Sequence, residues 1–187
     1  MLVTGLRTGE VIGAKWAEID LEREIWVIPP ERLKDRWIRT EPHRIPLSRQ
    51  VIMLLDQLPR VGEYVFAGQK AGNGLSNMAM LQVLKDLNRD ASGQPLWVDP
   101  RSGRPITPHG LRATFRTWGE DAGFPRELLE EALGHQIGTV VERAYRRTDS
   151  FDHRRKVMQA WADFCEGREP GAFGSGVNVP FLEGGQR

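Results

Sequence analysis

The sequence predicts a mainly α-helical (α+β) fold with a small antiparallel β-sheet near the N-terminus. Apolar residues recur with helical spacing in most segments after residue 48. Shorter, strand-like segments bounded by turn residues come before that point. The 187 residues are 40% hydrophobic, which is enough for the core of one sizeable domain.

The sheet is expected from three segments close to the N-terminus. Residues 16–20 lead into one strand, and residues 24–28 form a second strand that two prolines stop. Residues 43–47 form the third. The lysine- and arginine-rich residues 32–44 therefore form the basic connection of a hairpin.

Helices are expected before and after this sheet. Residues 64–66 form a short buried extended piece, and residues 92–105 form a loop rich in Gly, Pro and Ser. Three helices begin at hydroxyl-bearing capping residues. They are residues 8–15 with Thr8, residues 48–59 with Ser48, and residues 76–87 with Ser76.

Residues 107–123 form a helix with sharp ends. Thr107 caps it, Pro108 fits its first position, and Gly123 lies just past its end. One side is apolar, whereas another carries basic residues near the N-terminus, where unpaired amides favour anions. This pattern predicts a phosphate-sized site, with an exposed basic helix face as the alternative. The apolar stripe is Leu111, Phe115, Trp118 and Ala122, and the basic cluster is His109, Arg112 and Arg116.

The next segments place two more polar residues at short helices. Gly134 ends a helix over residues 126–133, which leaves His135 at the turn that follows. Residues 139–146 form a short helical segment that carries Tyr145.

A final helix, capped by Asp149 or Ser150, closes the predicted domain of residues 1–166. Its basic run at residues 154–156 is interpreted as a solvated face rather than a groove-reading one. The glycine-rich residues 167–187 are expected to form an extended or disordered tail. The first residues look like the end of a helix, so a preceding N-terminal portion is expected to be missing.

Composition excludes several classes of protein. The net charge of +1 means that any nucleic-acid site must arise from a local arrangement of charges. The single cysteine, Cys165, excludes a disulfide framework and a cysteine metal site, and is typical of a reducing cytoplasm. No apolar run approaches the length needed to span a membrane.

Five short motifs stand in a particular order along the chain. They are Thr4-Gly-Leu-Arg-Thr-Gly-Glu10, Glu31-Arg-Leu-Lys34 followed by His43-Arg-Ile-Pro-Leu-Ser48, His109-Gly-Leu-Arg112, Leu133-Gly-His135, and Ala144-Tyr145. In that order the sequence resembles the tyrosine recombinase (phage integrase) family, especially its prophage and genomic-island integrases. The resemblance covers residues 4–145, and a helix over residues 150–164 is also similar to the family's C-terminal helix.

The resemblance implies a helical catalytic domain of the tyrosine recombinase type that needs no metal and no other cofactor. It implies that Tyr145 attacks a DNA phosphodiester and forms a covalent 3′-phosphotyrosyl intermediate. Arg7 and Arg112 would present forked donors to the phosphate oxygens, and His135 would donate a hydrogen bond to the phosphate. Two proton-transfer roles complete the catalytic set. Lys34 would protonate the leaving 5′-oxygen, and His109 would assist proton transfer at Tyr145.

The implied partner is double-stranded DNA at attachment sites. The family acts as a tetramer on DNA, and a monomer or weak oligomer is expected without DNA. The expected location is the bacterial cytoplasm, in association with the nucleoid. No association with a membrane is expected. A charge run on the solvated surface remains the alternative for Lys34. The residues expected to contact DNA without a catalytic role are Arg32, Arg36, Arg39, Arg116 and Arg143.

Two other functions remain open at this point. One is a non-cleaving remnant that binds DNA or a partner recombinase, suggested by the missing N-terminal portion and the near-neutral charge. The other is a relaxing enzyme similar to type IB topoisomerases, which share the chemistry.

Overall fold

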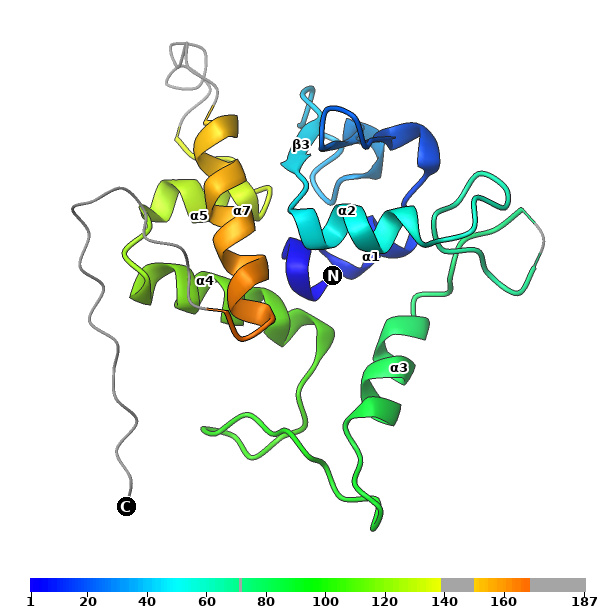
Figure 1. Ribbon diagram of the computed structural model, residues 1–187, viewed down its shortest axis with the longest axis vertical. Coiled ribbons are helices and arrows are strands. Elements are labelled where there is room, and N and C mark those ends of the chain that lie inside the picture. Colours follow the sequence, from blue (N-terminus) through cyan, green and yellow to red (C-terminus); the bar gives the residue numbers. More distant parts are fainter. Residues whose placement is uncertain (71, 139–149, 169–187) are drawn as a thin grey trace.

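The computed structural model describes residues 1–70, 72–138 and 150–168. It confirms a mainly helical fold with one small antiparallel sheet (Figure 1). The sheet has the order β1-β2-β3, with β1 at Ile19–Asp20, β2 at Ile25–Ile28 and β3 at His43–Pro46. In the β2–β3 pair, Ile28 lies opposite His43. The two strands are thus the arms of the predicted hairpin, and residues 29–42 connect them.

The sheet packs with α1 (Thr8–Ile12) and α2 (Arg49–Asp56) around one hydrophobic core. The Ser48 side chain caps α2 by accepting a hydrogen bond from the amide of Val51, as predicted. The predicted cap of α1 was wrong, because Arg7 occupies that position and the helix ends before Gly13. The buried members of this core include Leu6, Val11, Trp26, Ile28, Leu33, Ile45, Leu47, Val51, Leu55 and Val65.

A second core lies between α4 (Pro108–Asp121), α5 (Arg126–Ala132) and α7 (Phe151–Cys165). Thr107 caps α4 as predicted, accepting a hydrogen bond from the amide of Gly110 at 3.2 Å. Helices α4 and α5 approach closely at Gly119, where an added methyl group would lie 2.3 Å from Leu129 Cδ2. The buried members of this core are Phe115, Leu129, Ala132, Leu133, Val157, Met158 and Trp161.

Helix α7 joins the two cores. It packs against β3 and against the short 3-10 helix Leu2–Thr4. The Trp161 indole donates to the carbonyl of Leu2 at 2.8 Å, and Arg154 Nη1 donates to the carbonyl of Arg44 at 2.6 Å. Segments from both ends of the sequence are therefore fixed side by side.

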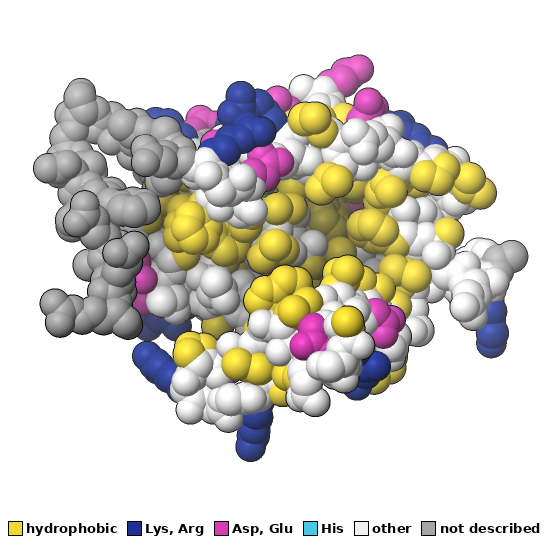
Figure 2. All heavy atoms as spheres, turned by 60° about the horizontal axis from the view of Figure 1, so that its bottom comes forward, with side chains coloured by type: hydrophobic (Ala, Val, Ile, Leu, Met, Phe, Trp, Pro, Cys, Tyr) yellow, Lys and Arg dark blue, Asp and Glu magenta, His cyan; other side chains and the backbone are white. Residues whose placement is uncertain are grey.

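Helix α3 (Ala79–Leu87) lies to the right of α4 in Figure 1, contacts α4, and has no fully buried residue. It begins at Ala79 without a side-chain cap, so the predicted capping by Ser76 was wrong. Figure 2 shows apolar side chains gathered in a hollow on one face of the molecule. An apolar groove of the first core is lined by Met1, Val3, Val11, Ala14, Trp26, Val51, Leu54, Leu55, Leu58, Val65 and Phe66, among others. No helix in the described ranges is long and apolar enough to cross a membrane.

The second core gives a direct stability prediction at Phe115. This side chain is fully buried and meets the ring of Trp161 edge-on, with ring centroids 5.4 Å apart. Phe115→Ala is expected to lower the free energy of unfolding by about 3 kcal/mol, through lost burial and the cavity left behind. Urea denaturation measures this change. Phe164 in the same aromatic cluster is 46% exposed, so Phe164→Ala is the control and should cost far less.

Candidate active site

Arg7 is held in place by Glu10. The Arg7 backbone amide donates to Glu10 Oε2 at 2.8 Å, and Arg7 Nη1 donates to Glu10 Oε1 at 3.0 Å. Glu10 is 2% exposed, whereas 26% of the Arg7 side chain remains exposed. A buried carboxylate therefore orients an arginine that still reaches solvent.

Arg112 lies between the two cores rather than on the surface. It is 5% exposed. Its Nη1 donates to the carbonyl of Gly5 at 2.5 Å, and its Nη2 donates to the carbonyl of Leu133 at 3.0 Å. Burial, together with the nearby charge of Arg7, lowers the pKa of Arg112 to about 10. The alternative of an exposed basic helix face is wrong for Arg112, and its guanidinium lies within electrostatic range of Arg7.

His135 reaches the same place from the end of α5. Gly134 turns the chain with a φ of +73°, a conformation that favours glycine, and the His135 amide donates to the carbonyl of Glu130 at 2.9 Å. His135 Nε2 then lies 3.4 Å from Arg112 Nη2. Arg7, Arg112 and His135 come from three distant parts of the sequence and converge in the fold.

Lys34 and His109 are the two residues predicted to transfer protons. Both are exposed, His109 at the start of α4 one turn before Arg112, and Lys34 on the β2–β3 connection. Arg39 ties that connection to the turn before His135, because its Nη1 donates to the carbonyl of Gly134 at 2.8 Å. The Lys34-bearing connection is thus anchored next to the converging residues.

The residues predicted to contact DNA differ in their exposure and in the protein groups that they bind. Arg32 binds Glu18 and the carbonyls of Glu10 and Gly13 inside the protein, so we leave it out of the proposed DNA contacts. Arg36 is exposed and stacks 4.7 Å from the ring of Trp37, which is itself 83% exposed.

Two further predicted residues, Arg39 and Arg116, are held by protein groups. Arg39 is 9% exposed in its side chain, and Arg116 Nε lies 3.3 Å from Glu120 Oε1 and 3.0 Å from Glu130 Oε1. Arg143 and the predicted nucleophile Tyr145 lie outside the described residues.

His43 is buried beside the site, although the sequence pointed to it only as part of the hairpin motif. It is 3% exposed, and its Nε2 has no hydrogen-bond partner within the described part of the chain. A methyl group added at Gly134 would lie 3.1 Å from this ring. Burial, together with the charges of Arg39 and Arg154, lowers the pKa of His43 to about 3. The alternation of β3 could have predicted its burial but not the arginines around it.

The buried His43 leads us to expect that the free energy of unfolding falls in acid. Its folded pKa of about 3 lies below the ordinary 6.5, so the unfolded chain binds the proton more tightly. Its contribution to stability is complete above pH 6.5 and is lost as the pH falls toward 3, by about 1.4 kcal/mol per pH unit at most. Urea denaturation at several pH values should show a shallower decline for His43→Gln than for the unaltered chain. Equal declines would contradict this assignment.

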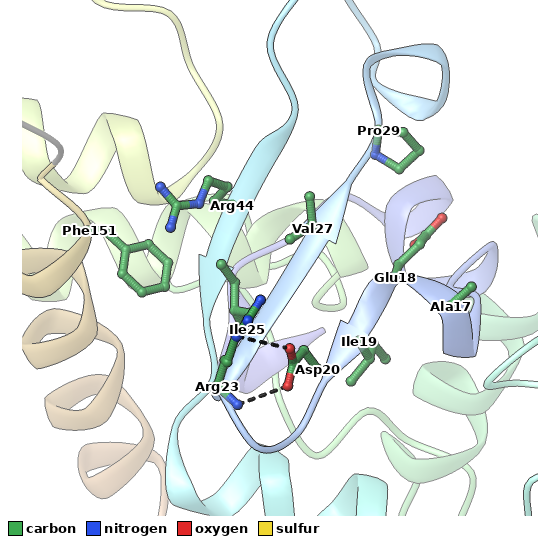
Figure 3. A pocket seen from close by; sticks show the side chains of 10 residues that line it. All are labelled: Ala17, Glu18, Ile19, Asp20, Arg23, Ile25, Val27, Pro29, Arg44 and Phe151. Carbon is green, nitrogen blue, oxygen red and sulfur yellow. Dashed lines mark hydrogen bonds and ion pairs between the residues drawn. The ribbon is translucent and has the colours of Figure 1, made fainter.

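A separate hollow lies on the outer face of the sheet (Figure 3). Asp20 pairs with Arg23 at its edge, and the Arg44 guanidinium lies 4.8 Å from the ring of Phe151. None of the converging residues lines it. The Phe151 contact instead fixes the start of α7 on the sheet, shortly after the position of Tyr145 in the sequence.

Fold and site together define the class of protein. The chain matches the phage integrase family over residues 1–150 and belongs to that family, whose members are tyrosine recombinases. Its fold is shared with an integrase from mycobacterium phage Brujita, at a TM-score of 0.59 and 21% identity over 84% of this chain and 47% of that one. It is also shared with the Tn1549 transposon integrase in complex with transposon right end DNA, at a TM-score of 0.52 and 20% identity over 86% of this chain and 56% of that one.

Sequence relatives point to the same family. The prophage integrase IntA of Escherichia coli K12 is 30% identical over 91% of this chain and 38% of its own length. The integrase of Shigella phage Sf6 is 32% identical over 87% of this chain and 39% of its own length. The chain thus spans about two fifths of the curated relatives that it matches.

Proposed function

We propose that this chain is the catalytic part of an enzyme for site-specific DNA recombination, and that it cleaves and rejoins DNA through Tyr145. The observation that supports this most is the convergence of Arg7, Arg112 and His135 between the two cores. Paired guanidinium groups suit a phosphodiester because each can present two parallel N–H donors to its oxygens. Membership of the phage integrase family supports the same reaction.

The proposed reaction balances without a metal or an external energy source. The Tyr145 oxygen forms a bond to phosphorus and gives up its proton, while the bond from phosphorus to the 5′-oxygen breaks. Lys34 supplies a proton to that 5′-oxygen, and His109 assists removal of the phenolic proton. Arg7, Arg112 and His135 stabilise the charge that develops on the non-bridging oxygens. The phosphotyrosyl bond keeps the energy that a new 5′-hydroxyl needs for religation.

A suicide duplex tests this proposal. The substrate carries an attachment site of the source element with a nick beside the scissile phosphate, so that the released fragment diffuses away. A covalent protein–DNA band is the expected result. Absence of a band, with binding still seen in a mobility shift, would contradict cleavage and favour the non-cleaving remnant. Relaxation of any supercoiled plasmid without site preference would favour the topoisomerase-like alternative.

A further inference from the structure

Glu130 contacts the ring of His135 on the side away from Arg112. The two residues lie on α5 and on the turn that ends it, and His135 Nδ1 is within hydrogen-bond distance of Glu130 Oε2. The opposite ring nitrogen, Nε2, faces Arg112 Nη2 at 3.4 Å. The side chain of His135 is 42% exposed, so packing alone does not fix its orientation. The Glu130 carboxylate therefore contacts one ring nitrogen of His135, and the Arg112 guanidinium faces the other.

Arg116 pairs with the carboxylate oxygen of Glu130 that does not contact His135. Its Nε lies 3.0 Å from Glu130 Oε1, an ion pair that lacks hydrogen-bond geometry, while the other carboxylate oxygen serves His135. Only 17% of the Glu130 side chain is exposed. Burial by itself would raise the pKa of Glu130, but the hydrogen bond with His135 and the positive charges around it lower the pKa on balance. The group beside His135 is therefore a carboxylate, which accepts and does not donate.

We infer that Glu130 is a positioning residue for His135, held in turn by Arg116, and that it keeps a proton on Nδ1 so that Nε2 is the nitrogen presented to the phosphate. This inference rests on the proposed function. A carboxylate on Nδ1 fixes which ring nitrogen carries the proton, and also fixes the plane of the ring. Without it the ring can turn, and Nε2 no longer has a set direction.

The arrangement also explains how His135 and Arg112 share one phosphate. In the neutral ring, Nε2 can accept a hydrogen bond from Arg112 Nη2. When Nε2 carries a proton, both groups are donors, and a phosphate oxygen between them can accept from both. Because the Glu130 carboxylate can only accept, it occupies Nδ1, and Nε2 is the nitrogen that faces that oxygen. Arg7, Arg39, Arg126 and His43 are further ionisable groups near this turn, and Glu10 acts on Arg112.

Cleavage of the suicide duplex at saturating DNA measures the effect of Glu130. Glu130→Ala is expected to slow adduct formation by about 10–100-fold, the usual cost of removing such a supporting partner, with DNA affinity nearly unchanged. Glu130→Gln should restore part of the rate, because its amide oxygen still accepts from Nδ1–H. Glu127 is exposed on the same helix, so Glu127→Ala is the matched control and should cleave at the unaltered rate.

Nitrogen-15 spectra of the histidine rings give a readout that does not depend on cleavage. The four histidines can be assigned by single substitutions. The Nδ1 signal of His135 should move in Glu130→Ala and stay in place in Glu127→Ala. A Glu130→Ala variant that cleaves within twofold of the unaltered chain, or leaves that signal in place, would overturn the inference. If the unaltered chain forms no adduct, the proposed function fails. The spectra alone then test whether Glu130 contacts His135 Nδ1.

Discussion

Tyr145→Phe is expected to abolish the covalent protein–DNA band while leaving DNA affinity within about twofold. The change removes one oxygen atom, which in the proposed reaction is the atom that bonds to phosphorus. Residual cleavage by water would leave no protein attached to DNA. Loss of the adduct should therefore be complete within detection, unlike the partial losses expected from residues that only stabilise charge.

The sequence offers a matched control, because it contains only two tyrosines. Tyr64 precedes Val65 of the first core and pairs with Lys15 in an isolated β-bridge. Tyr64→Phe should form adduct at the unaltered rate. The covalent band is resolved on a denaturing gel with end-labelled DNA, and a mobility shift measures affinity. An undiminished band with Tyr145→Phe would place the nucleophile elsewhere and contradict the proposed chemistry.

Local signals in the sequence predicted the elements that carry the site. Ser48 and Thr107 cap their helices as expected, because a hydroxyl before a helical run satisfies a free amide whatever surrounds it. The end of α5 at Gly134 was also predicted, since a left-handed conformation there follows from glycine chemistry. Motif order then placed Arg7, Arg112 and His135 in one site, and the fold brings them together.

Contacts between residues far apart in the sequence could not be predicted from local sequence patterns. Helical periodicity put Arg112 on a basic face, but only the packing of two cores shows that its donors bind carbonyls of Gly5 and Leu133. Arg32 was grouped with DNA contacts on charge density, yet it binds Glu18 within the fold. Glu130 gave no signal at all, because an acidic residue on a short helix is ordinary until its neighbour across the turn is known.

Replacement of Arg112 should show how the fold and the site depend on each other. Arg112→Lys keeps the charge but cannot donate to Gly5, Leu133 and a phosphate oxygen from one planar group. Cleavage at saturating DNA is expected to fall by about 10²–10³-fold, the usual cost of one donor to a developing oxyanion. Arg112→Ala should lose at least as much activity. It should also lose about 1–3 kcal/mol of unfolding free energy for each of the two carbonyls that lose a buried partner.

Stability and activity must be measured on the same variants, because a misfolded protein would also fail to cleave. Urea denaturation gives the first quantity, and the rate of adduct formation at saturating duplex gives the second. Arg60→Lys is the control, since Arg60 is exposed after α2, beside the ring of Trp16. An Arg112→Lys variant that is stable and cleaves within about fivefold of the unaltered chain would show that forked donation is not needed. A stable variant that binds DNA and does not cleave would instead locate the loss in the transition state, where the phosphate gains charge and the guanidinium of Arg112 matters most.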